Sequence, residues 1–301
     1  MPFFGDMTTK QLSAGQERKR RNRRRSLTRA AIQLLFFVSM PGAYVAGFNG
    51  IKYIFRQLSS GGLLEWNSFV TALAGLGVFT IIFGRFFCGY ICAFGSLGDF
   101  VYWLSGLFQK KILKKKKQVS IPQTVLPWLQ KLKYVNLAFI LIVTAMGWSG
   151  ALQGTSAWDV FSRLTAFRLP DRSFGIGILC LAVILVGMGV QSRFFCQFLC
   201  PMGAFFATLP ILPFMALRRD PANCLKGCNA CRNTCPAGLK LEPDGLRSGE
   251  CLSCEKCIGI CPKNNLHYPA GRLFKKEVLY ILFRAAVFFV LGAWTGLCRF
   301  L

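Results

Sequence analysis

The sequence predicts an all-α membrane bundle of about five transmembrane helices with an internal parallel repeat, followed by a small α+β module rich in cysteine. Hydrophobic residues make up 53% of the 301 residues and the mean hydropathy is +0.43, values that soluble domains of this size rarely reach. Five apolar runs approach the roughly 20 residues of helix that a bilayer core requires. Cysteine is the other signal, because most of the 14 cysteines lie between Cys224 and Cys261.

The apolar runs define the expected membrane domain. They are Ala30–Phe48, Phe69–Phe87, Val135–Leu152, Phe174–Val190 and Val278–Leu297. Arg284, near the start of the last run, is expected to reach the membrane interface or, alternatively, to act as a cation near a redox site. Two shorter apolar stretches, Phe94–Phe108 and Gly203–Leu217, favour interfacial or re-entrant segments.

The positive charge also fits a membrane protein. Lysine and arginine outnumber aspartate and glutamate by 37 to 12, for a net charge of +25. These charges fall in short clusters between apolar runs, which argues against nucleic acid as a partner. We expect residues 1–29, with the run Arg18–Arg25, to form a disordered cytoplasmic arm held by anionic membrane lipid. A twin-arginine export signal matches the surrounding residues poorly.

The basic clusters orient the chain in a bacterial cytoplasmic (inner) membrane. The N-terminal arm, the run Lys114–Lys117 and the pair Lys131 and Lys133 should all be cytoplasmic. Successive spans then place the cysteine-rich segment inside and Leu301 outside. The predicted domains are the arm (1–29), a membrane domain (30–219) with repeats at 30–108 and 134–217, the cysteine-rich module (220–268) and a C-terminal transmembrane helix (269–301).

A duplication lies within the membrane domain. The segment Arg85–Gly95 (RFFCGYICAFG) matches Arg193–Gly203 (RFFCQFLCPMG), 108 residues further on. Both copies follow spans of the same direction, so an axis along the membrane normal would relate them. Each CxxxC pair is expected on one helix face. Cys88, Cys92, Cys196 and Cys200 are therefore candidates for a metal, a further cluster or a redox-active dithiol; the alternative is apolar packing.

The cysteine-rich module carries two ferredoxin motifs. The second has the bacterial spacing C-x2-C-x2-C-x3-C-P, and the first has one added residue between its first two cysteines. Three close cysteines hold one [4Fe-4S] cluster and the fourth holds the other. One cluster is thus assigned to Cys224, Cys228, Cys231 and Cys261, and the second to Cys251, Cys254, Cys257 and Cys235. A zinc site needs four ligands for one ion and does not require this interlocked spacing, and disulfides are disfavoured in the cytoplasm.

Three charged residues near the CxxxC pairs are candidate catalytic residues. Arg85 and Arg193 each precede a pair by three residues, and either anchor a helix end at the interface or act on a cofactor or a quinone carbonyl. Asp99 is the nearby carboxylate that could accept protons. A quinol pocket is expected between Arg85–Phe87 and Arg193–Phe195, next to the segments after each CxxxC.

The paired R-x-F-C-x3-C segments followed by a dicluster bacterial-ferredoxin module resemble the NapH/MauN-type polyferredoxin membrane proteins. These are relatives of a quinol dehydrogenase membrane subunit and of the C-terminal half of NosR-type proteins. The resemblance covers roughly residues 30–268. It implies quinol oxidation and electron delivery to other redox subunits. The chain departs from the pattern at Cys92-Ala93, where the family usually has Cys-Pro, and in its added C-terminal helix.

The expected function is therefore membrane-bound iron–sulfur electron transfer between the quinone pool and a redox partner, as a redox subunit of a quinol dehydrogenase-type complex. The alternative is an accessory or assembly protein that supplies electrons for maturation of a metalloenzyme, or for metal or disulfide reduction. A transporter is disfavoured because the five runs contain no string of acidic residues or histidines. No flavin, dinucleotide or haem attachment motif is present, so partners must supply the ends of the electron path.

Overall fold

The computed structural model describes residues 3–111, 121–122, 124–148, 155–165, 168–169, 172–220, 222–239, 249–274 and 277–297. Side chains are described from residue 15 onward, except that of Arg172. The predicted cytoplasmic run Lys114–Lys117, the cysteine Cys298 and the terminal Leu301 lie outside the described residues.

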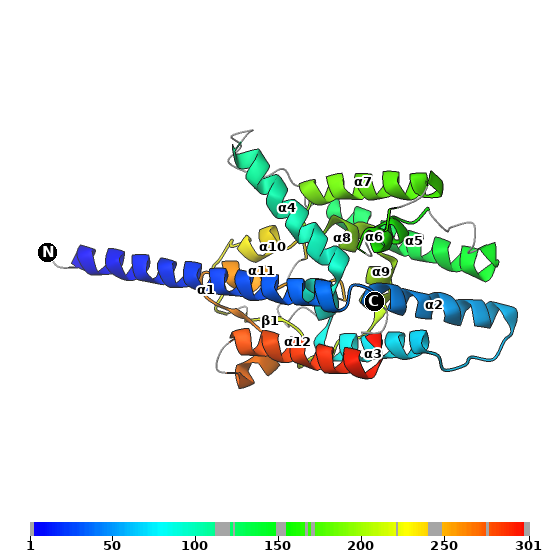
Figure 1. The fold of residues 1–301 in the computed structure, drawn as a ribbon. Helices are drawn as coiled ribbons and strands as arrows, with labels where there is room; N and C mark the ends of the chain where they lie inside the picture. Colours follow the sequence, from blue (N-terminus) through cyan, green and yellow to red (C-terminus); the bar gives the residue numbers. More distant parts are fainter. Residues whose placement is uncertain are drawn as a thin grey trace.

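Helices dominate the fold (Figure 1). They are α1 (Phe3–Ser39), α2 (Ala43–Ser60), α3 (Ser68–Phe83), a π-helical turn (Phe87–Ile91), α4 (Ala93–Lys111), α5 (Leu126–Ala145), α6 (Ala157–Thr165), a 3-10 turn (Arg172–Phe174), α7 (Gly175–Val190), α8 (Phe194–Phe198), α9 (Pro201–Thr208), α10 (Ala230–Thr234), α11 (Lys256–Ile260), a 3-10 turn (Ala270–Leu273) and α12 (Glu277–Trp294). Two short strands, β1 (Arg218–Arg219) and β2 (Leu266–His267), belong to the cysteine-rich module.

The apolar helices present hydrophobic side chains on the outer surface of the bundle. Val78 of α3, Val183 of α7 and Val290 of α12 are 52%, 61% and 68% exposed. Such a surface is stable against lipid. By length and composition, α5 and α12 can each cross a membrane, as can the bent pair Gly15–Ser39 with Ala43–Ser60; α3 and α7 are apolar but shorter. The chain is thus a membrane protein, and the number of five full spans stays a prediction.

The first predicted span is broken, and the helix before it is longer than expected. α1 and α2 meet at 63° around Pro41, whose ring prevents the preceding residue from continuing a helix. The N-terminal arm, predicted to be disordered, is helical from Phe3 onward. That prediction was wrong because the arm has partners: Asn22 donates to the Gly259 carbonyl at 2.8 Å. Farther along α1, Arg25 pairs with a glutamate at the start of α12.

The two short apolar stretches also form helices. Phe94–Phe108 lies within α4, which crosses the neighbouring helices obliquely (Figure 1). Gly203–Leu217 begins in α9, which ends at Thr208, two residues before Pro210. With eight residues, α9 is too short to cross a bilayer core, as expected for a segment that is not a full span.

The C-terminal helix α12 is part of the bundle core. The Phe288 ring lies 5.0 Å from that of Phe79 in α3, measured between centroids. Arg284 is fully buried and pairs with Glu255 of the cysteine-rich module. The expectation that Arg284 reaches the membrane interface was therefore wrong. A guanidinium that has left water needs a carboxylate partner, and Glu255 supplies one beside the ligand Cys254.

A two-stranded antiparallel sheet closes the cysteine-rich module. Arg218 lies opposite His267 and Arg219 opposite Leu266, so β1 and β2 join the chain before the first motif to the chain after the second. The short helices α10 and α11 lie between the strands in the sequence and pack against each other. The module is thus a small α+β unit at one end of the helical bundle (Figure 1).

Candidate iron–sulfur site

Five predicted cluster ligands line one cavity in the module. Cys251, Cys254 and Cys257 of the second motif share it with Cys235 and with Cys231, which is assigned to the other cluster. Burial, and then the neighbouring thiols of Cys254, Cys251 and Cys235, raise the pKa of Cys257, so the four sulfur atoms are close neighbours. Much of the remaining wall is apolar, with Leu217, Ala237 and Leu252. The structure brings together the four cysteines that the spacing assigned to the second cluster.

The other four predicted ligands lie around α10 and the end of α11. Cys224 is close enough to Cys231 to affect its pKa, and Cys231 and Cys261 pack against the same apolar group. Cys228 is partly exposed. The two cysteines before proline, Cys235 and Cys261, have φ, ψ angles of −69°, 121° and −63°, 118°. Proline imposes this extended conformation on the residue before it, which turns both thiols away from their own short helix.

This donor set fits iron–sulfur clusters better than a single metal ion. Each thiolate of a cluster binds a different iron atom, so the ligands stand apart around a cavity. Within the described part of the chain, no group of three or more His, Cys, Asp or Glu side chains is arranged to hold one metal ion. The backbone N–H of Asn265 donates to Cys261 Sγ at 3.4 Å, and hydrogen bonds to sulfur tune cluster potentials.

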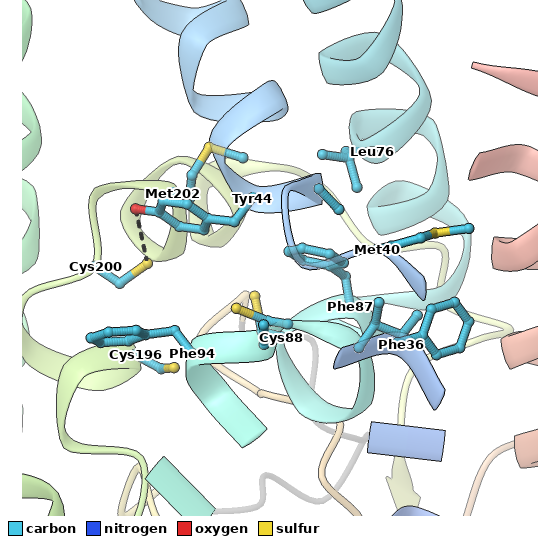
Figure 2. Close-up of a cluster of buried hydrophobic side chains, with 14 of the residues drawn as sticks. Phe36, Met40, Tyr44, Leu76, Phe87, Cys88, Phe94, Cys196, Cys200 and Met202 are labelled. Atoms are coloured by element: carbon cyan, nitrogen blue, oxygen red, sulfur yellow. Dashed lines mark hydrogen bonds between the residues drawn. The ribbon is translucent and has the colours of Figure 1, made fainter. Parts of the chain in front are cut away.

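The CxxxC cysteines come together in the bundle core. Cys88, Cys92, Cys196 and Cys200 are 6%, 7%, 4% and 5% exposed and belong to one group of buried side chains (Figure 2). Burial, and then the Cys196 and Cys88 thiols, raise the pKa of Cys92, so the cysteines are neighbours across the two copies. The Cys200 thiol donates to Tyr44 Oη at 3.9 Å (Figure 2).

The two cysteines of each pair do not share a continuous helix face, contrary to expectation. Cys88 lies in the π-helical turn and Cys196 in α8, whereas Cys92 and Cys200 have extended backbones with ψ of 120° and 112°. The proline after Cys200 explains its conformation. Because Cys92 adopts the same conformation before alanine, the departure from Cys-Pro in the first copy leaves the backbone path unchanged.

Each copy of the repeat packs its arginine on the glycine of the other copy. A Cβ atom on Gly203 would lie 2.9 Å from Arg85 Nη2 and 3.0 Å from the Cys196 carbonyl oxygen. A Cβ atom on Gly95 would overlap Arg193 Nη1. The two-fold relation predicted from the repeat would produce this exchange, and only glycine leaves room for the guanidinium. The motif therefore ends in glycine for a packing reason.

Both motif arginines are structural links inside the protein. Arg85 and Arg193 are each 1% exposed, which excludes the interface-anchor alternative. Arg193 donates to the Gly89 carbonyl and to Asp99, both at 2.6 Å. Arg85 donates to the Gly249 carbonyl at 3.3 Å, beside the second cysteine motif. Arg193 thus links the first CxxxC turn to Asp99 of α4, and Arg85 links the first CxxxC segment to the loop of the second cysteine motif.

Asp99 is held by three cations. Its Oδ2 atom lies 2.6 Å from both Arg193 and Arg29, and Oδ1 lies 3.6 Å from Lys256. Burial alone would raise the pKa of Asp99, but Arg193 and Arg29 outweigh burial and hold the pKa well below its usual range. A carboxylate so stable as an anion accepts protons poorly, so these contacts do not favour the role predicted for Asp99 as a proton acceptor, which stays a prediction.

The quinol pocket expected beside the motif arginines is filled by side chains. Phe86 and Phe87 are both buried. The Phe86 ring stacks on Tyr90 at 4.5 Å between centroids, and the Phe87 ring meets Phe206 edge-on. Aromatic residues at this place pack the junction between the two copies, so a quinol would have to bind elsewhere.

The loop of the second cysteine motif sits directly on the first copy of the repeat. A Cβ atom on Gly89 would overlap the Leu252 carbonyl oxygen. Tyr90 Oη donates to Glu255 Oε2 at 3.2 Å. The turn that carries Cys88 therefore touches the loop that carries the predicted cluster ligands.

Two carboxylates in this junction were missed by sequence reasoning. Glu250 pairs with Lys133 of α5 and accepts from Tyr134 Oη at 2.6 Å, while Glu255 pairs with Arg284. A signal was present, because the chain has only 12 acidic residues and both of these adjoin a predicted ligand. Acidic residues this scarce in a basic membrane protein are candidates for buried ion pairs.

Substituting Gly89 by alanine should disrupt this junction. The new methyl group would strike a backbone oxygen that cannot rotate away, so we expect a loss of about 1–3 kcal/mol in stability. The matched control is Gly77→Ala in α3, where a Cβ atom would meet nothing within 4 Å among the described residues. Thermal unfolding in detergent should show a lower Tm for Gly89→Ala only. Equal Tm values would contradict the close packing.

Comparison with a family model supports iron–sulfur binding at the CxxxC segments. A family model described as a 4Fe-4S binding domain matches residues 66–116 and 174–212. Each matched segment contains one copy of the CxxxC motif. No solved structure matches the chain. The fold and the cysteines together define an iron–sulfur electron-transfer protein of the membrane.

The resemblance predicted from the motifs is confirmed by named relatives. The ferredoxin-type protein MauN of Methylobacillus flagellatus is 28% identical over 62% of this chain and 61% of its own length. The ferredoxin-type protein NapH of Escherichia coli is 25% identical over 64% of this chain and 66% of its own. An uncharacterized protein of Methanocaldococcus jannaschii is 29% identical over 83% of this chain and 98% of its own.

Proposed function

We propose that this protein carries electrons between the membrane quinone pool and other redox subunits, using two [4Fe-4S] clusters. Each cluster, when bound, accepts or gives one electron at a time. The ligands are those assigned from the spacing, with Cys235 and Cys261 exchanged between the motifs. The observation that carries the proposal is the contact between Gly89 and Leu252, because it joins the buried CxxxC turn to the cluster-binding loop.

For the quinone ring we propose a place beside the CxxxC cysteines that it enters by displacing packed aromatic side chains. Tyr44, which contacts Cys200, stacks on Trp158 with ring centroids 3.8 Å apart. Both aromatic side chains are buried, and Trp158 Nε1 has no hydrogen-bond partner in the described part of the chain. A flat quinone ring stacks on aromatic rings, and its carbonyl oxygen accepts from a free N–H.

The orientation follows from the basic clusters, with the N-terminus and the ferredoxin module cytoplasmic and the C-terminus outside. The CxxxC cysteines belong to the same electron path, as a further cluster or thiolate site between Arg85 and Arg193. The family-model match to both copies supports this assignment. Two buried cations beside four thiols also suit a cofactor that is anionic when bound.

Anaerobic addition of a menaquinol or ubiquinol analogue should reduce the clusters of the purified protein, seen as loss of visible absorbance and gain of an EPR signal.

Trp158→Phe keeps an aromatic ring but removes the N–H, so the quinol KM should rise about fivefold, the effect of one hydrogen bond. Iron content should not change. The control is Trp66→Phe, at a tryptophan that is 79% exposed.

The opposite outcome selects the other function. If neither quinol reduces the clusters nor reduced clusters reduce quinone, the accessory role becomes the better one. In that role the protein would supply electrons for maturation of a metalloenzyme, or for metal or disulfide reduction.

A further inference from the structure

The basic half of α1 lies along the ferredoxin module. Asn22 donates to the Gly259 carbonyl at 2.8 Å, and Arg21 donates to Asn264. About two turns farther along α1, Arg29 donates to the Cys254 carbonyl at 3.4 Å. The helix is thus fixed beside a predicted ligand of the second cluster.

A cationic pocket opens between α1 and α11. It is lined by Arg25 and Arg29 from α1 and by Cys254, Glu255 and Lys256 from the module. Its charges are partly paired: Arg25 with Glu277, Arg29 and Lys256 with Asp99, which Arg193 also contacts, and Glu255 with Arg284. Five cations thus face three carboxylates, so the pocket keeps excess positive charge next to a predicted cluster ligand.

Arg25 has donors without partners in this pocket. Its side chain is 8% exposed, and one nitrogen pairs with Glu277. The Nη1 and Nε atoms are buried and have no hydrogen-bond partner among the residues that the structure describes. A buried N–H donor of a charged group costs free energy unless an acceptor binds it. An anionic oxygen is the strongest such acceptor for a guanidinium.

The outer side of the same helix is strongly basic. Its exposed cations are Arg18, Lys19, Arg20, Arg23 and Arg24, which we call the basic face. The sequence from Arg18 to Arg29 contains no acidic residue. Arg21 and Asn22, which lie among these cations in the sequence, contact the module, so the basic face flanks the module, and the N-terminal end of α1 extends beyond it (Figure 1). A cationic surface beside predicted cluster ligands can guide an acidic soluble partner to them.

We infer that the basic face docks an acidic, soluble one-electron carrier, with a carboxylate of the carrier reaching Arg25 in the pocket. The inference rests on the proposed electron-transfer function and names its partner on the cytoplasmic side. One electron passes in each encounter: the carrier is oxidised, the cluster bound at Cys254 is reduced, no bond forms and no proton moves. Complementary charge brings the carrier to the ligand and sets its orientation.

The test measures binding as well as electron transfer, with the full chain in nanodiscs. The probe is a small acidic [2Fe-2S] ferredoxin, used oxidised for the Kd and reduced for stopped-flow reduction of the clusters. Arg23→Glu with Arg24→Glu should weaken binding about tenfold or more and slow the reduction similarly, because charges at the rim govern association. The matched control is Lys110→Glu with Lys111→Glu, which reverses the charge of two exposed side chains at the end of α4.

The outcomes separate this inference from the proposed function. Quinol-driven cluster reduction should be the same in both double variants, so a failure of the quinol test is read independently of ferredoxin binding. Equal loss of binding in both double variants, or no binding by the unmodified protein at low salt, would overturn the inference. So would protection of Arg23 and Arg24 from trypsin in phosphatidylglycerol discs but not in phosphatidylcholine discs, which would assign the basic face to lipid.

Discussion

Cys235→Ala and Cys261→Ala should each lower the iron content from about eight atoms per chain to about four or fewer. Each of these cysteines is the last cysteine of one motif but is assigned to the cluster of the other motif. Cys235 lines a cavity together with Cys251, Cys254 and Cys257. Loss of either exchanged ligand therefore removes one cluster directly and weakens the fold around the second. Iron and sulfide analysis of anaerobically purified protein, with EPR of the reduced form, measures the effect.

The control for the cysteine variants is Cys180→Ser in α7. Cys180 is exposed on the outer surface of the bundle, far in sequence from both motifs, so its replacement should leave the iron content unchanged. Two results would contradict the assignment. One is an unmodified protein that contains zinc and no iron, and the other is full iron content in Cys235→Ala.

The cluster ligands of the module could be predicted from the sequence because they occur at fixed short spacings along the chain. Three cysteines within one loop, and a fourth before proline, determine which thiols meet. The same reasoning predicts the exchange of Cys235 and Cys261, and the cavity that Cys235 shares with the second motif is consistent with it. The apolar runs were found for a similar reason, because hydrophobic length is a local property.

The ion pairs of the core could not be predicted in the same way. Arg284 and Glu255 are 29 residues apart, and Arg193 and Asp99 are 94 apart. Which cation meets which carboxylate depends on how α12 and α4 pack, and hydropathy patterns carry no information on that. The N-terminal arm was misjudged for the same reason. Its arginines resemble a solvated arm until the module provides acceptors such as the Cys254 carbonyl.

The repeat shows an intermediate case. Two matching segments, and an axis between them, could be predicted from the sequence, but the side chains that cross that axis could not. The structure adds the exchange of Arg85 to Gly203 and of Arg193 to Gly95. These four residues belong to the repeated motif, so the motif encodes both the cysteines and the contact that brings them together.

Asp99→Asn should destabilise the protein by about 3–5 kcal/mol, because removing one partner of a buried ion pair leaves the other charge unpaired. The side chain of Arg193 is fully buried and that of Arg29 is 11% exposed, so neither can turn to water. Asparagine has nearly the same shape, so the effect comes from charge. Thermal unfolding in detergent should show a Tm lower by about 5–8 degrees.

The matched control is Asp159→Asn in α6, the same substitution at an exposed carboxylate. That change should cost about 1 kcal/mol or less, because water solvates the site in both forms. The pKa of Asp99 is depressed in the folded protein, so its contribution is present above the unfolded pKa of about 3.9 and is lost only below it. The difference between Asp99→Asn and the unmodified protein should therefore be constant from pH 6 to 8. Equal Tm values for Asp99→Asn and Asp159→Asn would show that water reaches Asp99 and that its charge does not hold the repeat and the module together.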